Sequence, residues 1–231
     1  MDTDLLRSRL QETWTRIASA ASKHGRPPDS VRLLAISKSQ PHEAIRALAE
    51  LGQRDFGENY LQEALPKIAA LSDLELTWHF TGQLQSNKTR PVAQHFDWVH
   101  TVDRERIAVR LNDQRPHYAL PLNVCIQVRL VEEPGKGGVA PSELLPLAQR
   151  IRELPKLALR GLMCIPPPSS DFETQRARFE ELARYQRELI AQGFELDTLS
   201  MGMSDDFEAA IAAGATWVRI GTAIFGPRSR L

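Results

Sequence analysis

The stretch "VRLLAISKSQPHEAIRALAELG" (31–52) contains one strand followed by one helix, and much of the chain repeats that unit. The apolar run at 31–37 is typical of a buried strand. Residues 41–52 have the apolar spacing of a helix, with Pro41 in the first turn and Gly52 at the stop. Strands that alternate with helices pair in parallel through helical crossovers. The stretch therefore predicts an α/β fold with a parallel sheet.

Seven further strand candidates follow, and a helix separates each from the next. Eight such units in about 200 residues predict a closed (β/α)8 barrel of the TIM type, and the alternative is an open doubly wound sheet. The segment before the first strand is helical, and we expect it to pack outside the barrel or across one end. We expect residues 1–231 to form a single barrel domain. The further strands are expected at 54–58, 76–82, 97–102, 120–130, 157–165, 195–202 and 216–221.

Composition favours a cytoplasmic protein. Lys+Arg and Asp+Glu are both 29, and this zero net charge argues against a large surface for nucleic acid or anionic lipid. The N-terminus lacks the pattern of a signal peptide, and charged residues interrupt every stretch long enough to span a membrane. Cys125 and Cys164 lie in apolar runs, which favours buried thiols over a disulfide, and no cysteine or histidine spacing is typical of a metal site. We also expect a monomer.

Lys38 directly follows the first strand. In βα barrels the functional side chains gather at the carboxyl ends of the strands, so the Lys38 amine should reach the barrel mouth. An amine among apolar side chains loses solvation, which favours its neutral form, and a neutral amine can attack a carbonyl to form a Schiff base. The alternative is a lysine that is ion-paired at the rim of the barrel.

A second candidate lies in "SMGMSDDFEAAIAAGATWVRIGTAIFG" (200–226). Ser204 is expected to cap a helix over 204–213. Gly221 permits close approach of the backbone, and Thr222 offers a hydroxyl where a short helix begins. Amides at two successive helix starts after the last two strands predict an anion site, at the place where barrels often bind phosphate. The alternative is that these residues only make tight turns.

The first and last strands of a closed barrel are neighbours, so a ligand with an aldehyde and a phosphate could bridge the two features. Pyridoxal phosphate (PLP) is one such molecule, and a phosphorylated sugar aldehyde is another. Asn59 and His79 are further candidates near strand ends, although His79 is equally consistent with a core histidine. Arg219 ends the last strand. Because arginine keeps its proton, facing a pyridine nitrogen it would leave that nitrogen unprotonated.

Five motifs resemble the pyridoxal-phosphate homeostasis protein family over nearly the whole chain. They are "ISKSQP" (36–41), "FGENYLQE" (56–63), "WHFTGQLQSNK" (78–88), "GLMCIPP" (161–167) and the long motif that ends at 226. The resemblance implies a barrel like the N-terminal domain of alanine racemase. It implies a Schiff base to PLP at one lysine, an arginine at the pyridine nitrogen, phosphate-binding residues and a ring pocket. By this resemblance Lys38 carries the Schiff base and Arg219 faces the pyridine nitrogen. Ser204, Gly221 and Thr222 hold the phosphate, and Asn59 and His79 line the ring pocket.

The resemblance also implies a function in which PLP is carried or buffered and passed to transient apo-enzyme recipients, without established catalysis. One alternative is an amino-acid racemase, which needs a second acid/base on the opposite face of the ring. In alanine racemase a further domain supplies that group, and we expect none in this sequence. A Schiff-base aldolase for phosphorylated sugars is a third reading. Gln40 stands where the family often has a second lysine, so a cofactor relay through that lysine is not expected.

Overall fold

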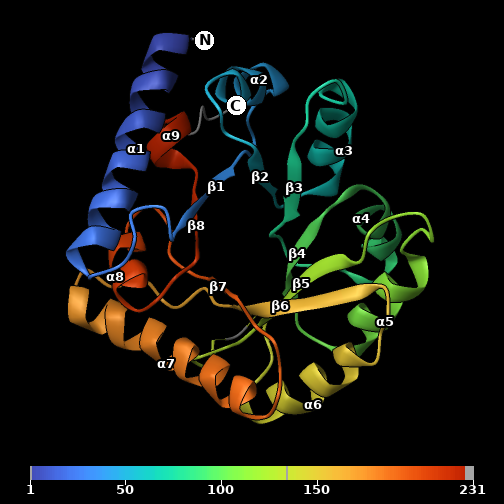
Figure 1. Cartoon of the computed structure of the whole chain (residues 1–231). Helices are drawn as coiled ribbons and strands as arrows, with labels where there is room; N and C mark the ends of the chain where they lie inside the picture. The colour runs from blue at the N-terminus through green and yellow to red at the C-terminus, as the bar shows by residue number, and fades with distance from the viewer. Residues whose placement is uncertain (1, 134, 227–231) are drawn as a thin grey trace.

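The short apolar runs form the strands of a closed parallel barrel. The computed structural model describes residues 2–133 and 135–226. Each strand pairs with the next along the chain, and β8 returns to pair with β1, which confirms the barrel and excludes the open sheet (Figure 1). The strands are β1 (Arg32–Ile36), β2 (Asp55–Glu58), β3 (Thr77–Phe80), β4 (Trp98–Val102), β5 (Leu122–Gln127), β6 (Leu157–Met163), β7 (Thr198–Ser200) and β8 (Trp217–Ile220).

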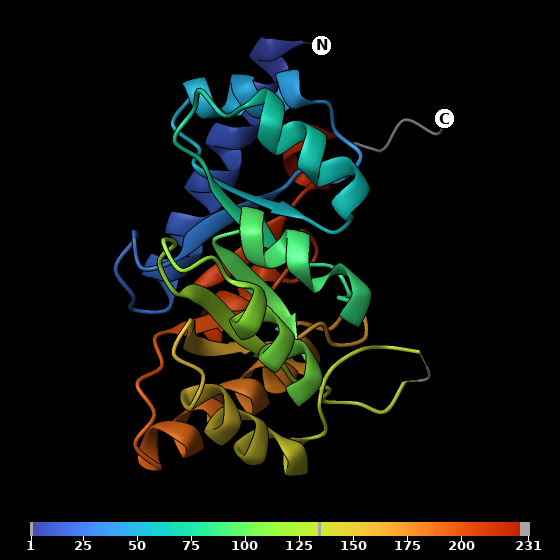
Figure 2. The same ribbon diagram turned by 90° about the vertical axis from the view of Figure 1, so that its right-hand side faces the viewer.

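The helices lie around the outside of the strands, as the two views in Figures 1 and 2 show. Their apolar faces pack on the barrel and form one large core with the strands. Within the described part of the chain, no helix has the length and apolar character that crossing a membrane requires. The helices are α1 (Thr3–Lys23), α2 (His42–Glu50), α3 (Leu61–Ala70), η1 (Ser86–Lys88), α4 (Thr89–His95), α5 (Glu105–Gln114), α6 (Pro141–Arg152), α7 (Phe172–Ala191), α8 (Phe207–Ala212) and α9 (Thr222–Phe225).

The N-terminal helix α1 packs outside the barrel, against α2, α8 and α9. Leu6, Leu10 and Ile17 recur on one helical face and are buried, because residues three or four apart share a face. Of the two positions expected for this helix, the structure therefore shows the outer one (Figure 1).

Closure of the barrel places the first strand, β1, beside the last strand, β8. Leu33 pairs with Val218, and Ala35 pairs with Ile220. A Cβ added at Gly221 would lie 3.1 Å from the carbonyl oxygen of Ile36, so this approach is easiest for glycine. The residues that follow β1 and β8 consequently meet at the same end of the barrel.

Both cysteines are free and fully buried, which confirms that they behave as small apolar side chains. Burial raises the pKa of the Cys164 thiol to about 12, and it raises the pKa of Cys125 further. Because the thiolate is the reactive form, both features oppose reaction with thiol reagents.

We therefore expect a thiol reagent at about pH 8 to modify neither cysteine in the folded protein. In urea-unfolded protein, both thiols regain an ordinary pKa and should react quickly. The measurement is the labelling rate by mass spectrometry, with the unfolded protein as control. Fast labelling of Cys125 or Cys164 before unfolding would contradict the packing described above.

Candidate functional site

One cavity of about 440 Å³ lies at the carboxyl end of the barrel. This volume is within the range of about 300–1,000 Å³ that is typical of small-ligand sites. The walls come from the ends of β1, β2 and β8 and from the turn before α8. Six of the seven residues proposed from the sequence line it, and these are Lys38, Asn59, Ser204, Arg219, Gly221 and Thr222.

Lys38 lies in the tight turn that follows β1. The amide of Gln40 donates to the carbonyl of Ser37 at 3.0 Å and closes this turn. Ser39 has φ 60°, and among the described residues it is the non-glycine residue with a positive φ. Such a conformation costs about 1–3 kcal/mol and is common at functional sites. Gln40 also lines the cavity, so a neutral amide stands where a second amine was considered.

Arg219 is a buried cation on the cavity wall, with 5% of its surface exposed. Its Nη1 donates to Ser200 Oγ and its Nη2 donates to the carbonyl of Cys164, both at 2.9 Å. Burial lowers the pKa of Arg219, but a guanidinium stays protonated in proteins. Since both hydrogen bonds go to neutral oxygens, the site favours a ligand atom that is rich in electrons.

Gly221 and Thr222 form the start of α9, as expected, but Ser204 does not cap α8. The helix begins at Phe207, three residues later than Ser204. The Asp206 carboxylate accepts a hydrogen bond from the amide of Met203 at 2.6 Å and closes the turn that precedes the helix. The expectation of a Ser204 cap was therefore wrong, and Ser204 lines the cavity from within that turn.

Asn59 follows β2 and is held by the end of β3. Its Oδ1 accepts a hydrogen bond from the Thr81 hydroxyl at 2.8 Å. A Cβ at Gly82 would lie 2.1 Å from the carbonyl oxygen of Asn59, so only glycine fits this contact. The bond to Oδ1 leaves the amide NH2 of Asn59 as the group that can donate to a ligand.

His79 is not among the residues that line the cavity, which differs from the expected ring pocket. It is fully buried inside the barrel. Its Nε2 lies 3.0 Å from Asp55 Oδ1, and its Nδ1 lies 2.9 Å from Nε2 of His100. Burial lowers the pKa of His79 and keeps the ring neutral. The position fits the core-histidine alternative, because the side chain of a strand residue can point into the barrel interior.

These side chains form one hydrogen-bonded chain that runs through the barrel to Arg219. Burial also lowers the pKa of His100, whose Nδ1 lies 2.7 Å from Ser200 Oγ. When both histidine rings are neutral and Asp55 is a carboxylate, only one order of donors and acceptors gives every group in the chain a hydrogen-bond partner. Arg219 donates to Ser200, Ser200 to His100, His100 to His79, and His79 to Asp55. The chain thereby orients the Arg219 guanidinium.

Sequence reasoning missed several residues of the cavity. Two of them lie at the ends of expected strands, Thr81 one residue before the end of 76–82 and Ile165 at the end of 157–165, so the strand-end rule could have found them. Asp55, His100 and Ser200 of the interior chain gave no such signal, because they lie within the expected strands. The missed cavity residues are Ile36, Thr81, Ile165, Met203, Asp205 and Gly226.

Comparison with known proteins identifies the family. A protein of Pseudomonas aeruginosa named pyridoxal phosphate homeostasis protein is 57% identical over 219 residues, which cover 95% of this chain and 94% of that protein. The chain belongs to the pyridoxal phosphate homeostasis protein family. A protein of the same name from Escherichia coli K12 is 52% identical over 222 residues, with 95% of each chain covered. A sequence model described as alanine racemase, N-terminal domain, matches residues 7–229.

Solved structures agree with this membership in the pyridoxal phosphate homeostasis protein family. PipY of Synechococcus elongatus, determined with PLP bound, is 42% identical with a TM-score of 0.81, and the match covers 91% of this chain and 100% of PipY. Alanine racemase from Corynebacterium glutamicum is 15% identical with a TM-score of 0.73, over 98% of this chain and 62% of the enzyme. The second likeness concerns the fold alone.

For this member of the pyridoxal phosphate homeostasis protein family, we expect Ser200→Ala to lower the free energy of unfolding by about 1–3 kcal/mol. The change removes the hydrogen-bond partner of His100 Nδ1 and of Arg219 Nη1, and both atoms are buried. Urea unfolding measures the loss. Ser30→Ala is the matched control, because the buried Ser30 hydroxyl has no hydrogen-bond partner among the described residues. Equal stability of the two variants would contradict the interior chain.

Proposed function

We propose that this chain binds PLP through a Schiff base on Lys38 and acts as a carrier or buffer in the homeostasis of that cofactor. The observation that carries the proposal is the meeting of Lys38, Arg219 and the turn at Gly221 and Thr222 on one cavity. The names of the relatives and the PLP-bound structure of PipY support it. The proposed site of action is the cytoplasm, where the cofactor would pass to apo-enzymes through transient contacts.

Each wall of the cavity suits one part of PLP. The Lys38 amine is the group that can condense with an aldehyde. Gly221 and Thr222 offer main-chain amides and a hydroxyl to the phosphate, and Ser204 offers a second hydroxyl. PLP supplies an electron-withdrawing ring when its pyridine nitrogen is protonated.

The presence of Arg219 favours a carrier, which holds the cofactor, over an enzyme that uses the cofactor in rapid catalysis. In this proposal its guanidinium faces the pyridine nitrogen and donates to it, so the nitrogen stays unprotonated. The ring is then a weaker electron sink. The hydrogen bond to Ser200 Oγ, at the end of the interior chain, maintains this orientation.

The second candidate is an amino-acid racemase or a related PLP enzyme, and the match to the alanine racemase N-terminal domain favours it. Racemisation by two bases needs an acid/base opposite the lysine. Among the described residues that line the cavity, the ionisable side chain other than Lys38 and Arg219 is Asp205. Asp205 lies in the turn that also contributes Ser204, and this placement does not by itself supply a two-base pair.

Incubation with PLP should turn the purified protein yellow, and borohydride should then fix a pyridoxyl group on Lys38. Peptide mass spectrometry locates the group. Lys38→Ala should remove the label, whereas Lys23→Ala, on the outer helix α1, should leave it unchanged. A protein that stays unlabelled, or a label on another lysine, would overturn the proposal.

Exchange of the Cα hydrogen separates the two candidates. A carrier should exchange deuterium into free amino acids no faster than PLP attached to a simple amine, because Arg219 weakens the ring as an electron sink. Proton NMR of alanine in deuterated buffer measures the rate. Multiple turnovers that stop in Lys38→Ala would favour the racemase.

A further inference from the structure

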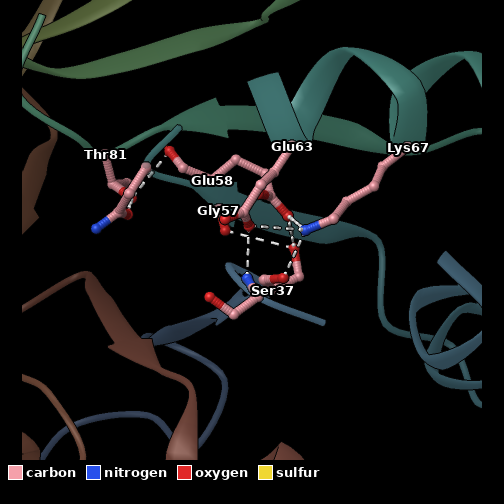
Figure 3. Close-up of polar contacts among 8 residues, drawn as sticks. Ser37, Gly57, Glu58, Glu63, Lys67 and Thr81 are labelled. Atoms are coloured by element: carbon pink, nitrogen blue, oxygen red, sulfur yellow. Dashed lines mark hydrogen bonds and ion pairs between the residues drawn. The ribbon is translucent and has the colours of Figure 1, made fainter. Parts of the chain in front are cut away.

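A buried ionic cluster lies directly behind the Lys38 turn, outside the set of cavity-lining residues. Glu58, the last residue of β2, is fully buried, and Lys67 of α3 is 8% exposed. Lys67 Nζ lies 2.8 Å from Glu58 Oε1 and 3.7 Å from Glu63 Oε2. The Ser37 hydroxyl donates to the same Glu58 oxygen at 2.5 Å. Figure 3 shows Lys67 reaching from α3 toward Ser37 and Glu58.

The cluster holds the peptide groups on both sides of Lys38. Lys67 Nζ donates to the Ser37 carbonyl at 2.8 Å, which belongs to the peptide bond before Lys38. Glu63 Oε2 accepts from the Ser39 amide at 2.7 Å, which belongs to the peptide bond after it. Because each peptide group is planar, holding both planes restricts the two backbone dihedrals of Lys38. One bond also stabilises Ser39 in its left-handed conformation.

Stability alone is a poor explanation for these charges. A buried ion pair often stabilises a fold less than apolar side chains of similar volume, because both charges lose their hydration. The cluster is also incompletely paired, since Glu58 Oε2 has no hydrogen-bond partner among the described residues. Burial raises the pKa of Glu58, against the opposing effect of Lys67 and Ser37. The charged side chains do, however, fix the conformation of the turn, because all three of their hydrogen bonds to it end on Ser37 or Ser39, the neighbours of Lys38.

We infer that Glu58, Glu63 and Lys67 form a positioning cluster that fixes the backbone of Lys38 so that its amine points into the cavity. The inference rests on the proposed role of Lys38 as the attachment point for PLP. In it, Lys67 and Glu63 hold the turn from α3, and Glu58 provides the charge that keeps Lys67 in place. None of the three needs to touch the cofactor, so they are positioning residues.

Two sets of variants separate positioning from stability. Lys67→Met leaves the Glu58 charge without its partner, so the melting temperature should fall. The double variant Glu58→Leu with Lys67→Met removes both charges, and its melting temperature should return close to that of the wild type. Glu63→Leu removes the acceptor for the Ser39 amide, whereas Glu63→Gln keeps an oxygen there and should behave like the wild type.

Arg115→Met is the matched control. Arg115 is also a buried cation that donates to backbone carbonyls, those of Ala93, Phe96 and Leu120. Its contacts lie near the starts of β4 and β5, at the opposite end of the barrel from Lys38. The change should lower stability without altering the Lys38 turn.

Two measurements follow each variant. The first is hydrogen exchange of the 37–40 peptide in cofactor-free protein, which we expect to become at least tenfold faster in the double variant and in Glu63→Leu. The second is the rate at which PLP and borohydride label Lys38, which we expect to fall at least tenfold in the same variants. Glu63→Gln and Arg115→Met should remain within about twofold of the wild type in both.

The outcomes are distinct. Wild-type exchange in the 37–40 peptide of the double variant would overturn the positioning cluster, whatever Lys38 binds. The inference would also be overturned if the double variant showed fast hydrogen exchange at 37–40 but labelled Lys38 at the wild-type rate. A loosely held turn would then be enough for Lys38 to react with PLP. If wild-type protein shows no label on Lys38, the proposed function fails, and the exchange measurement still decides whether the cluster holds the turn.

Discussion

Hydrogen-bonded closure between β1 and β8 is the constraint on which the site depends. The register that pairs Ala35 with Ile220 brings the end of the first strand against the end of the last. Lys38 and the Gly221 turn are far apart in the chain, yet both line one cavity because of this pairing. In an open sheet these strands could lie at opposite edges, and a ligand small enough for the 440 Å³ cavity could not reach both. The barrel thus converts two separate strand ends into one binding site.

Buried charge gives the site its second constraint. Arg219 and Lys67 are both cations with little exposure, but their surroundings differ. Arg219 donates to neutral oxygens and ends a chain of hydrogen bonds that crosses the barrel interior. Lys67 is paired with carboxylates and donates to the turn that contains Lys38. One cation is therefore available to a ligand, while the other is engaged with the protein itself.

Predictions from the sequence succeeded where the signal was local. The apolar run before Lys38 marks the end of a strand, and the glycine and threonine at 221–222 mark a turn, so their place at the barrel mouth followed from the fold class. The sequence left two roles open for His79, and the structure places it in the barrel interior. A position within a strand does not show whether the side chain faces the cavity or the interior. The Ser204 cap was wrong because Asp206 closes a turn before the helix begins.

The sequence by itself determined the order of strands and helices and the residues that fall at strand ends. Both follow from periodicities of two and 3.6 residues, which depend only on near neighbours. Tertiary structure decided between a closed barrel and an open sheet, and so whether the ends of the first and last strands meet. It alone decided that Lys67 of α3 is buried against Glu58. The physical reason is that burial and charge pairing arise from groups on different elements, whose distances are fixed only when the barrel closes.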